Sequence, residues 1–322
     1  MQLPSTERAE RDHAVLRFLA PRDEAGIDGT TVAAGHVLEW IDRAGFACAA
    51  GWSGSICATA YVGNVHFRRP IPVGSVVETG ARIIATGRTS MQVLVTVDVA
   101  DPRGGEPVRA TSCLLVYVAI DDDGDPRPVP AWSPSSLAEL DLTDRAEQRV
   151  RGRARIRSAM AAERYTGEGT APRLLLRFLT APGDGNGEGM VQGGTVMRWI
   201  DEAAQACAAS WTKRRTVGVY AGGIQFDRPI PVGSLVEVES RVIHTSEHSV
   251  HVASHVRAAD PMIGEYARIG GCISVFVVPG DDGRAEPVEP LPLVTDEDVR
   301  LDRHARDLIA MRAELDAIGE SD

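Results

Sequence analysis

The chain has 322 residues, 43% of them hydrophobic and 25% charged, with a formal net charge of −11. This composition is typical of a folded globular protein, and the length allows one large core or two ordinary ones. The negative charge gives no general attraction for nucleic acid or an anionic membrane, and the sequence has neither an apolar leader nor a membrane-length apolar run. We therefore expect a cytoplasmic protein without nucleic-acid binding or membrane insertion.

The second half of the chain repeats the first at a constant offset of 159 residues. The twelve residues from Phe67 to Glu78 match those from Phe226 to Glu237 at ten positions. So long a period indicates two copies of a domain rather than a solenoid. We place the first domain at residues 1–130, a tail helix and linker at 131–172, the second domain at 173–290 and a C-terminal tail helix at 291–322.

Each copy contains hydrophobic patterns typical of strands and others typical of helices. In the first copy, strand patterns are expected at 14–20, 56–69, 76–86, 91–101 and 108–120, and helices at 35–52 and 136–163. The second copy repeats them, with helices at 194–211 and 296–317. The first helix of each copy is apolar on nearly every face and must be buried. The sequence thus predicts an α+β fold in which each copy wraps a mostly antiparallel sheet around a long central helix.

Each central helix carries a carboxylate in its most apolar part, Asp42 in the first copy and Asp201 in the second. Burying a carboxylate is costly unless it is paired or faces a cavity, and burial raises its pKa toward the range of a general base. The alternative is an inherited structural carboxylate that caps or pairs a group inside. The neighbouring charges exchange sign between the copies, as in Glu39 and Arg198, which we interpret as a solvated edge.

The start of the central helix differs between the copies. The second copy has Gly193 and Gly194, whereas the first has Ala34 and Gly35. Glycines leave the backbone open, and the first free N–H groups of a helix, with its dipole, can stabilise negative charge on a carbonyl oxygen. The alternative is glycine retained for tight packing.

Neither the histidines nor the cysteines indicate a metal site. His244, His248, His251 and His255 lie on one expected strand, where alternation points His248 away from His251 and His255. The five cysteines lack CxxC spacing and fall in apolar runs, so we interpret them as small buried hydrophobes. A G-x-S-x-G nucleophile motif is also missing from the sequence.

Three segments, Gly193–Ala204, Phe226–Ser234 and the turn Gly87–Ser90, resemble the acyl-CoA thioesterases with two fused hot-dog domains. The resemblance covers nearly the whole chain, tail helices included. It implies a tandem hot-dog fold and hydrolysis of acyl-CoA to a free acid and CoA. It also implies no cofactor, since coenzyme A is part of the substrate, and assembly into a homo-oligomer, a dimer or trimer of such chains.

In the thioesterases that the chain resembles, the site forms between two hot-dog units. One unit supplies the helix start, and the other supplies the aspartate. Carried over here, one site pairs Gly193 and Gly194 with Asp42, and the other pairs the helix start at Gly35 with Asp201. The aspartate would activate water or attack the carbonyl directly. We favour the first site because its helix start holds two glycines.

The chain departs from the fused enzymes at one loop position. Where they usually carry an asparagine, four residues before the second glycine, this chain has Met190 and Thr31. Asn186 is near but out of register. Either Gln192 or a backbone group takes over the role of the asparagine, or activity is reduced.

The resemblance also implies that the turn before Ser90 and Ser249 lines a channel for the pantetheine arm. An ordinary turn serine explains both residues equally well. Only the first copy offers a phosphate partner there, Arg88, because the second copy has Glu247.

Two other functions remain open. Hot-dog enoyl-thioester hydratases pair an aspartate with a histidine, and His36 stands at the first helix start, where the second copy has Thr195. A non-catalytic acyl-CoA binding protein would account for the missing asparagine.

Overall fold

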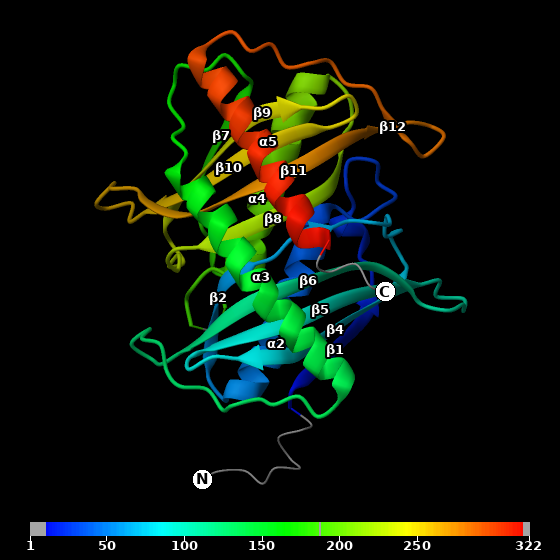
Figure 1. Cartoon of the computed structure of the whole chain (residues 1–322), viewed down its shortest axis with the longest axis vertical. Coiled ribbons are helices and arrows are strands. Elements are labelled where there is room, and N and C mark those ends of the chain that lie inside the picture. The colour runs from blue at the N-terminus through cyan, green and yellow to red at the C-terminus, as the bar shows by residue number, and fades with distance from the viewer. Residues whose placement is uncertain (1–10, 187, 318–322) are drawn as a thin grey trace.

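The two copies share one continuous antiparallel sheet. The structure is a computed structural model that describes residues 11–186 and 188–317. The main path of the sheet has the strand order β1-β4-β5-β6-β2-β8-β11-β10-β9-β7, so the two copies meet at the β2–β8 pair (Figure 1). The first copy contributes β1 (His13–Leu19), β2 (Ile56–Val62), β3 (Val65–His66), β4 (Val76–Thr86), β5 (Ser90–Ala100) and β6 (Val108–Ile120). The second contributes β7 (Arg173–Leu179), β8 (Val217–Phe226), β9 (Leu235–Thr245), β10 (Val250–Ala259), β11 (Ala267–Pro279) and β12 (Ala285–Glu286).

Four of the five strand patterns expected in the first copy are single strands in the structure, β1, β4, β5 and β6. In β5 the burial alternates along the strand, with Met91, Val93 and Val95 fully buried on the face toward the central helix. The expected strand at 56–69 is instead broken into β2 and β3. The chain turns at Gly63, whose amide donates to the carbonyl of Leu114, and β3 then pairs with β8 of the other copy.

The central helices α2 (Ala34–Ser53) and α4 (Gly193–Thr212) lie on one face of the sheet, behind it in Figure 1, and contact each other. Their apolar residues and those of both sheet halves form a common core, which includes Ile41 and Ile200. α2 ends at Gly54, which caps it in the left-handed conformation with φ 65°. Because the two helices pack on each other, the start of each one lies beside the middle of its partner.

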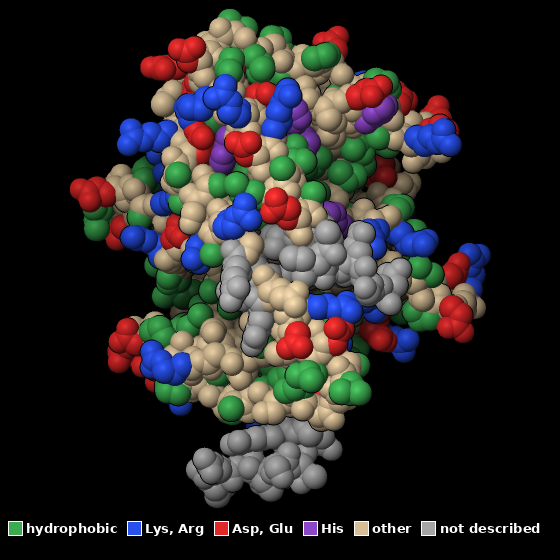
Figure 2. Space-filling model, in the orientation of Figure 1, with side chains coloured by type: hydrophobic (Ala, Val, Ile, Leu, Met, Phe, Trp, Pro, Cys, Tyr) green, Lys and Arg blue, Asp and Glu red, His purple; other side chains and the backbone are tan. Residues whose placement is uncertain are grey.

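The tail helices α3 (Leu137–Ala162) and α5 (Asp296–Ala317) cover the opposite face of the sheet. α3 contacts β4 in the first copy, then β8 and α5 in the second, so it runs diagonally across both halves (Figure 1). Acidic and basic side chains are interspersed over this face (Figure 2). Among residues 11–186 and 188–317, we find no helix with the length and apolar character needed to cross a membrane.

Candidate active site

The structure brings together the helix starts and the aspartates that the resemblance paired. The N–H of Gly194 donates to Oδ2 of Asp42 at 2.7 Å, and the N–H of Gly35 donates to Oδ2 of Asp201 at 2.9 Å. Both aspartates are only 4% exposed. Each carboxylate of one copy therefore lies at the positive end of the central helix of the other copy.

Asp42 receives two further hydrogen bonds, both from residues that the sequence analysis did not single out. Thr59 on β2 donates its hydroxyl to Oδ1 at 2.8 Å, and Tyr117 on β6 donates to the same carboxylate at 3.0 Å. Burial raises the pKa of Asp42, and the bonds from Thr59, Gly194 and Tyr117 oppose that increase. Burial and the adjacent carboxylate hold the pKa of Tyr117 far above its usual value, so the phenol stays protonated as a donor.

Asp201 lies in a poorer environment. The residues equivalent to Thr59 and Tyr117 are Gly218 and Phe276, which offer no hydroxyl. Among the described residues this carboxylate accepts its hydrogen bond from the N–H of Gly35, and burial raises its pKa to about 7. Comparing the copies at the offset of 159 would have revealed both differences from the sequence.

The glycines at the start of α4 are required by close packing. A Cβ on Gly193 would lie 2.8 Å from Oγ1 of Thr59, and one on Gly194 would lie 2.8 Å from Cα of Glu39. The tight-packing alternative therefore holds for both. In addition, the N–H of Gly194 already bonds Asp42, whereas that of Gly193 has no acceptor among the residues that the structure describes. Gly193 is thus the residue with a backbone donor to offer beside the carboxylate.

The contact between the start of α2 and the second copy, beside Asp201, has the complementary shape. Ala34 takes the place of Gly193 in the first copy, and it faces Gly218, where an added Cβ would be 3.3 Å from that of Ala34. Gly193 thus packs against Thr59 in one site, and the larger Ala34 packs against Gly218 in the other. The two sites differ in the shape and the chemistry of both contributions.

The solvated edge expected around Glu39 is wrong. Glu39 is 6% exposed and accepts a hydrogen bond from Nε of Arg198 at 3.1 Å, across the contact between α2 and α4. His36 contacts the same carboxylate at 3.0 Å, and Arg198 also pairs with Glu202 at 2.8 Å. The exchange of charge between the copies arises because these equivalent positions face each other, so opposite signs form an ion pair.

The loop residues before the two helices bond within their own loops. Thr31 donates its N–H and hydroxyl to Asp28, and Asn186 accepts from the N–H of Met190 at 3.1 Å. Gln192 precedes α4, and its amide lies 3.5 Å from the carbonyl of Gly185. Within residues 11–186 and 188–317 these side chains do not bond either aspartate, so the group that replaces the asparagine stays a prediction.

The hydrogen bonds of Asp42 and Asp201 within the described residues do not involve Arg88, Ser90 or Ser249. Arg88 is exposed in the turn before β5, and Ser90 precedes the inward-facing Met91, so its side chain lies on the face that the tail helices cover. Ser249 likewise precedes buried Val250 and contacts Ser246 at 2.6 Å. Their expected contact with the pantetheine arm stays a prediction.

All five cysteines are buried and free, as expected. His244 and His251 lie on the face of the second half-sheet that α5 covers, with ring centroids 5.1 Å apart, and His244 bonds Asp302. His248 is half-buried in the preceding turn. In the chain from 11 to 317, residue 187 aside, no group of three potential ligands could hold a metal ion.

Comparison with known proteins shows which family the chain resembles. The model of the thioesterase superfamily matches residues 29–106 and residues 188–265, one match in each copy. The cytosolic acyl coenzyme A thioester hydrolase of Homo sapiens is 26% identical over 331 residues, which cover 92% of this chain and 82% of that protein. The acyl-CoA thioester hydrolase YciA of Salmonella typhimurium is 31% identical over 131 residues, 40% of this chain and 98% of that protein.

One solved structure shows the same likeness over a single copy. It is an acyl-CoA hydrolase from Staphylococcus aureus in complex with butyryl coenzyme A, coenzyme A and coenzyme A disulfide. The two are 27% identical with a TM-score of 0.43, over 47% of this chain and 93% of that one.

Proposed function

The chain belongs to the thioesterase superfamily, and from that premise we propose that it hydrolyses acyl-CoA thioesters to a free acid and CoA. The observation that carries the proposal is the carboxylate of Asp42, held by Thr59, Tyr117 and the N–H of Gly194 at the start of the opposite helix. The proposed reaction requires no cofactor, since water, a base and backbone donors supply its steps.

In this mechanism Asp42 is the general base. It takes a proton from water as the water oxygen bonds to the thioester carbonyl carbon, and the proton then passes to the CoA sulfur as the C–S bond breaks. The N–H of Gly193 and the positive end of α4 stabilise the negative charge that develops on the carbonyl oxygen.

A base fits the geometry better than a nucleophile. Both carboxylate oxygens of Asp42 already accept hydrogen bonds, Oδ2 from Gly194 and Oδ1 from Thr59 and Tyr117. These hydrogen bonds hold the carboxylate in place. If Asp42 formed a covalent bond to the acyl carbon, it would lose its negative charge, and the hydrogen bonds would weaken. In this proposal the half-buried hydroxyl of Thr59, which donates to Oδ1 of Asp42, also accepts a hydrogen bond from the attacking water.

The two sites contribute unequally in this proposal. Asp201 lacks the hydroxyl donors that hold the carboxylate of Asp42. Its helix start carries Ala34 in place of Gly193. We therefore assign turnover to the Asp42 site.

The test is release of thiol from a panel of acyl-CoAs by the wild-type chain, Asp42→Asn and Asp201→Asn. Loss of a general base costs about 10²- to 10⁴-fold, so Asp42→Asn should lose at least 10²-fold in kcat while Asp201→Asn stays within a few-fold. Each variant keeps a side-chain oxygen that can accept the helix-start N–H, which makes the pair matched. If both variants turn over like the wild type, the mechanism is wrong.

The same panel separates the rival functions. A non-catalytic binder would bind acyl-CoA without releasing thiol. A hydratase would add water to an enoyl-CoA and likewise release no thiol. The ring nitrogen Nδ1 of His36 lies 3.0 Å from Glu39, so its recorded partner is this glutamate rather than an aspartate.

A further inference from the structure

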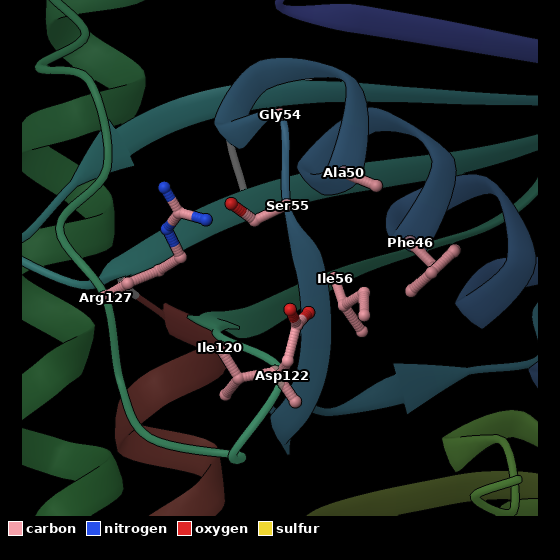
Figure 3. Close-up of a pocket in the computed structure, with 8 residues that line it drawn as sticks. All are labelled: Phe46, Ala50, Gly54, Ser55, Ile56, Ile120, Asp122 and Arg127. Atoms are coloured by element: carbon pink, nitrogen blue, oxygen red, sulfur yellow. The ribbon is translucent and has the colours of Figure 1, made fainter. Parts of the chain in front are cut away.

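An open pocket lies at the C-terminal end of α2. Its volume is about 450 Å³, within the range of small-molecule sites. Part of its wall is apolar and part is polar, and Phe46 and Arg127 lie on opposite sides of it in Figure 3. The apolar lining residues are Phe46, Ala50, Ile56 and Ile120, and the polar ones are Ser55, Asp122 and Arg127.

The pocket lies on the helix stripe that begins at Asp42. Asp42, Phe46 and Ala50 are spaced four residues apart, so they follow one another along the same side of α2. At 1.5 Å per residue, Phe46 lies about 6 Å and Ala50 about 12 Å along the helix from the carboxylate. Burial decreases along this stripe, from Asp42, which is buried, to Phe46 and Ala50, which are half-buried. The pocket therefore lies on the same side of α2 as the carboxylate, about one to two helical turns further along.

The second copy has a different surface at the equivalent place. Gln205 replaces Phe46, and its amide donates to the carbonyl of Thr216 at 2.9 Å. Ser55 and Arg127 are replaced by Arg214 and Glu286, which form an ion pair across the equivalent position. The apolar opening therefore accompanies Asp42, the aspartate with the hydroxyl donors.

We propose that this pocket binds the distal part of a medium-chain acyl group whose thioester carbonyl lies at Asp42. The inference rests on the proposed hydrolysis and adds its substrate class. The first methylenes lie along Phe46, and the following ones contact Ala50, Ile56 and Ile120. The tail ends beside Arg127 and Asp122 at the solvent, where longer chains leave the protein and gain little further binding.

The test is kcat/KM for acetyl-, butyryl-, hexanoyl-, octanoyl- and decanoyl-CoA in the wild type, Ala50→Trp and Ala209→Trp. Ala209 is the equivalent residue of α4 and is also half-buried, so it is the matched control. The indole at position 50 should reduce kcat/KM for octanoyl- and decanoyl-CoA by about tenfold or more, because hydrophobic pockets discriminate by about that factor. Acetyl- and butyryl-CoA should be unaffected, and Ala209→Trp should leave every ratio unchanged.

The outcomes decide the inference separately from the proposed function. If the wild type cleaves no acyl-CoA, the hydrolysis itself is wrong. If it does, equal effects on all chain lengths in Ala50→Trp, no effect, or the same chain-length effect in Ala209→Trp would overturn the pocket assignment. Ala50→Leu is the second variant in case the indole prevents folding. It should show a smaller loss in the same order of chain length, and a uniform loss in that folded variant would also overturn the assignment.

Discussion

At the scale of residues, the two aspartates show how much of the site can be predicted from the sequence. Their position in an apolar helix indicated buried carboxylates, and the resemblance paired each with the helix start of the other copy. The structure shows those contacts. The donors Thr59 and Tyr117 were missed because they lie on strands whose alternation reveals only which face is buried. No local sequence pattern indicates that a hydroxyl on a strand donates a hydrogen bond to a carboxylate on a helix.

The first prediction concerns Asp201 and pH. In the folded chain burial raises its pKa to about 7, from an ordinary value of 3.8. Between those values the folded state holds a proton that the unfolded state has lost, so stability decreases as pH rises and levels off above the folded pKa. Asp201→Asn removes this cost, and its free energy of unfolding above pH 7 should exceed that of the wild type by up to roughly 4 kcal/mol.

Urea unfolding at intervals from pH 4 to pH 8 measures the effect. The two chains should be most alike near pH 4 and separate as the pH rises. Asp42→Asn is the control, because it replaces a carboxylate that three hydrogen bonds stabilise and should gain less above pH 7. A constant difference between wild type and Asp201→Asn over this range would contradict the assigned pKa.

At the scale of elements, hydrophobic periodicity predicted the helices and most strands to within a residue or two. Central and tail helices were clear because their patterns are long, and β4 and β6 have the predicted bounds. The break between β2 and β3 was not predicted, since the apolar residues continue across it. β3 leaves its own copy to pair with β8, and such long-range pairing has no local signature.

The contact between α2 and α4 gives the second prediction. The Glu39 carboxylate is nearly buried, and Arg198 is its partner from the opposite helix. Burial opposes ionisation of Glu39, but the hydrogen bond from His36 and the charge of Arg198 outweigh it and hold the pKa of Glu39 below its usual value. Arg198→Met leaves that carboxylate without its cross-helix partner, so it should reduce the free energy of unfolding by about 3 kcal/mol.

A double-mutant cycle with Glu39→Gln isolates this pair. The double variant should recover much of the loss, because the buried charge is then gone as well. Arg43→Met, at an exposed arginine of α2 that lies 4.0 Å from Glu39, should cost less than about 1 kcal/mol. Additive losses in the cycle would show that Arg198 acts through packing alone.

At the scale of the whole molecule, the two copies share one sheet and one core. The sheet continues through β2 and β8, the central helices share a core, and α3 contacts strands of both copies. The repeat predicted two domains, but the extent of their contact could not be read from either copy alone. The homo-oligomer and the cytoplasmic location remain predictions from the sequence.

The third prediction follows from that shared core. Thermal unfolding should show one transition, with tryptophan fluorescence and far-ultraviolet circular dichroism giving the same midpoint. Gly35→Val and Gly194→Val, each of which forces a side chain between the helices, should each lower that common midpoint. Two separate transitions, with only one shifted by each variant, would mean that the halves unfold independently.

The unequal helix starts also determine which pairs of domains would be productive if the chain were cut in two. A pair of first copies would place Asp42 against the Ala34 start, and a pair of second copies would place the Gly193 start against Asp201. Only a mixed pair unites Asp42 with Gly193, and free domains would sort among all three combinations according to concentration. The covalent connection through α3 makes the mixed pair obligatory in every molecule, at any dilution.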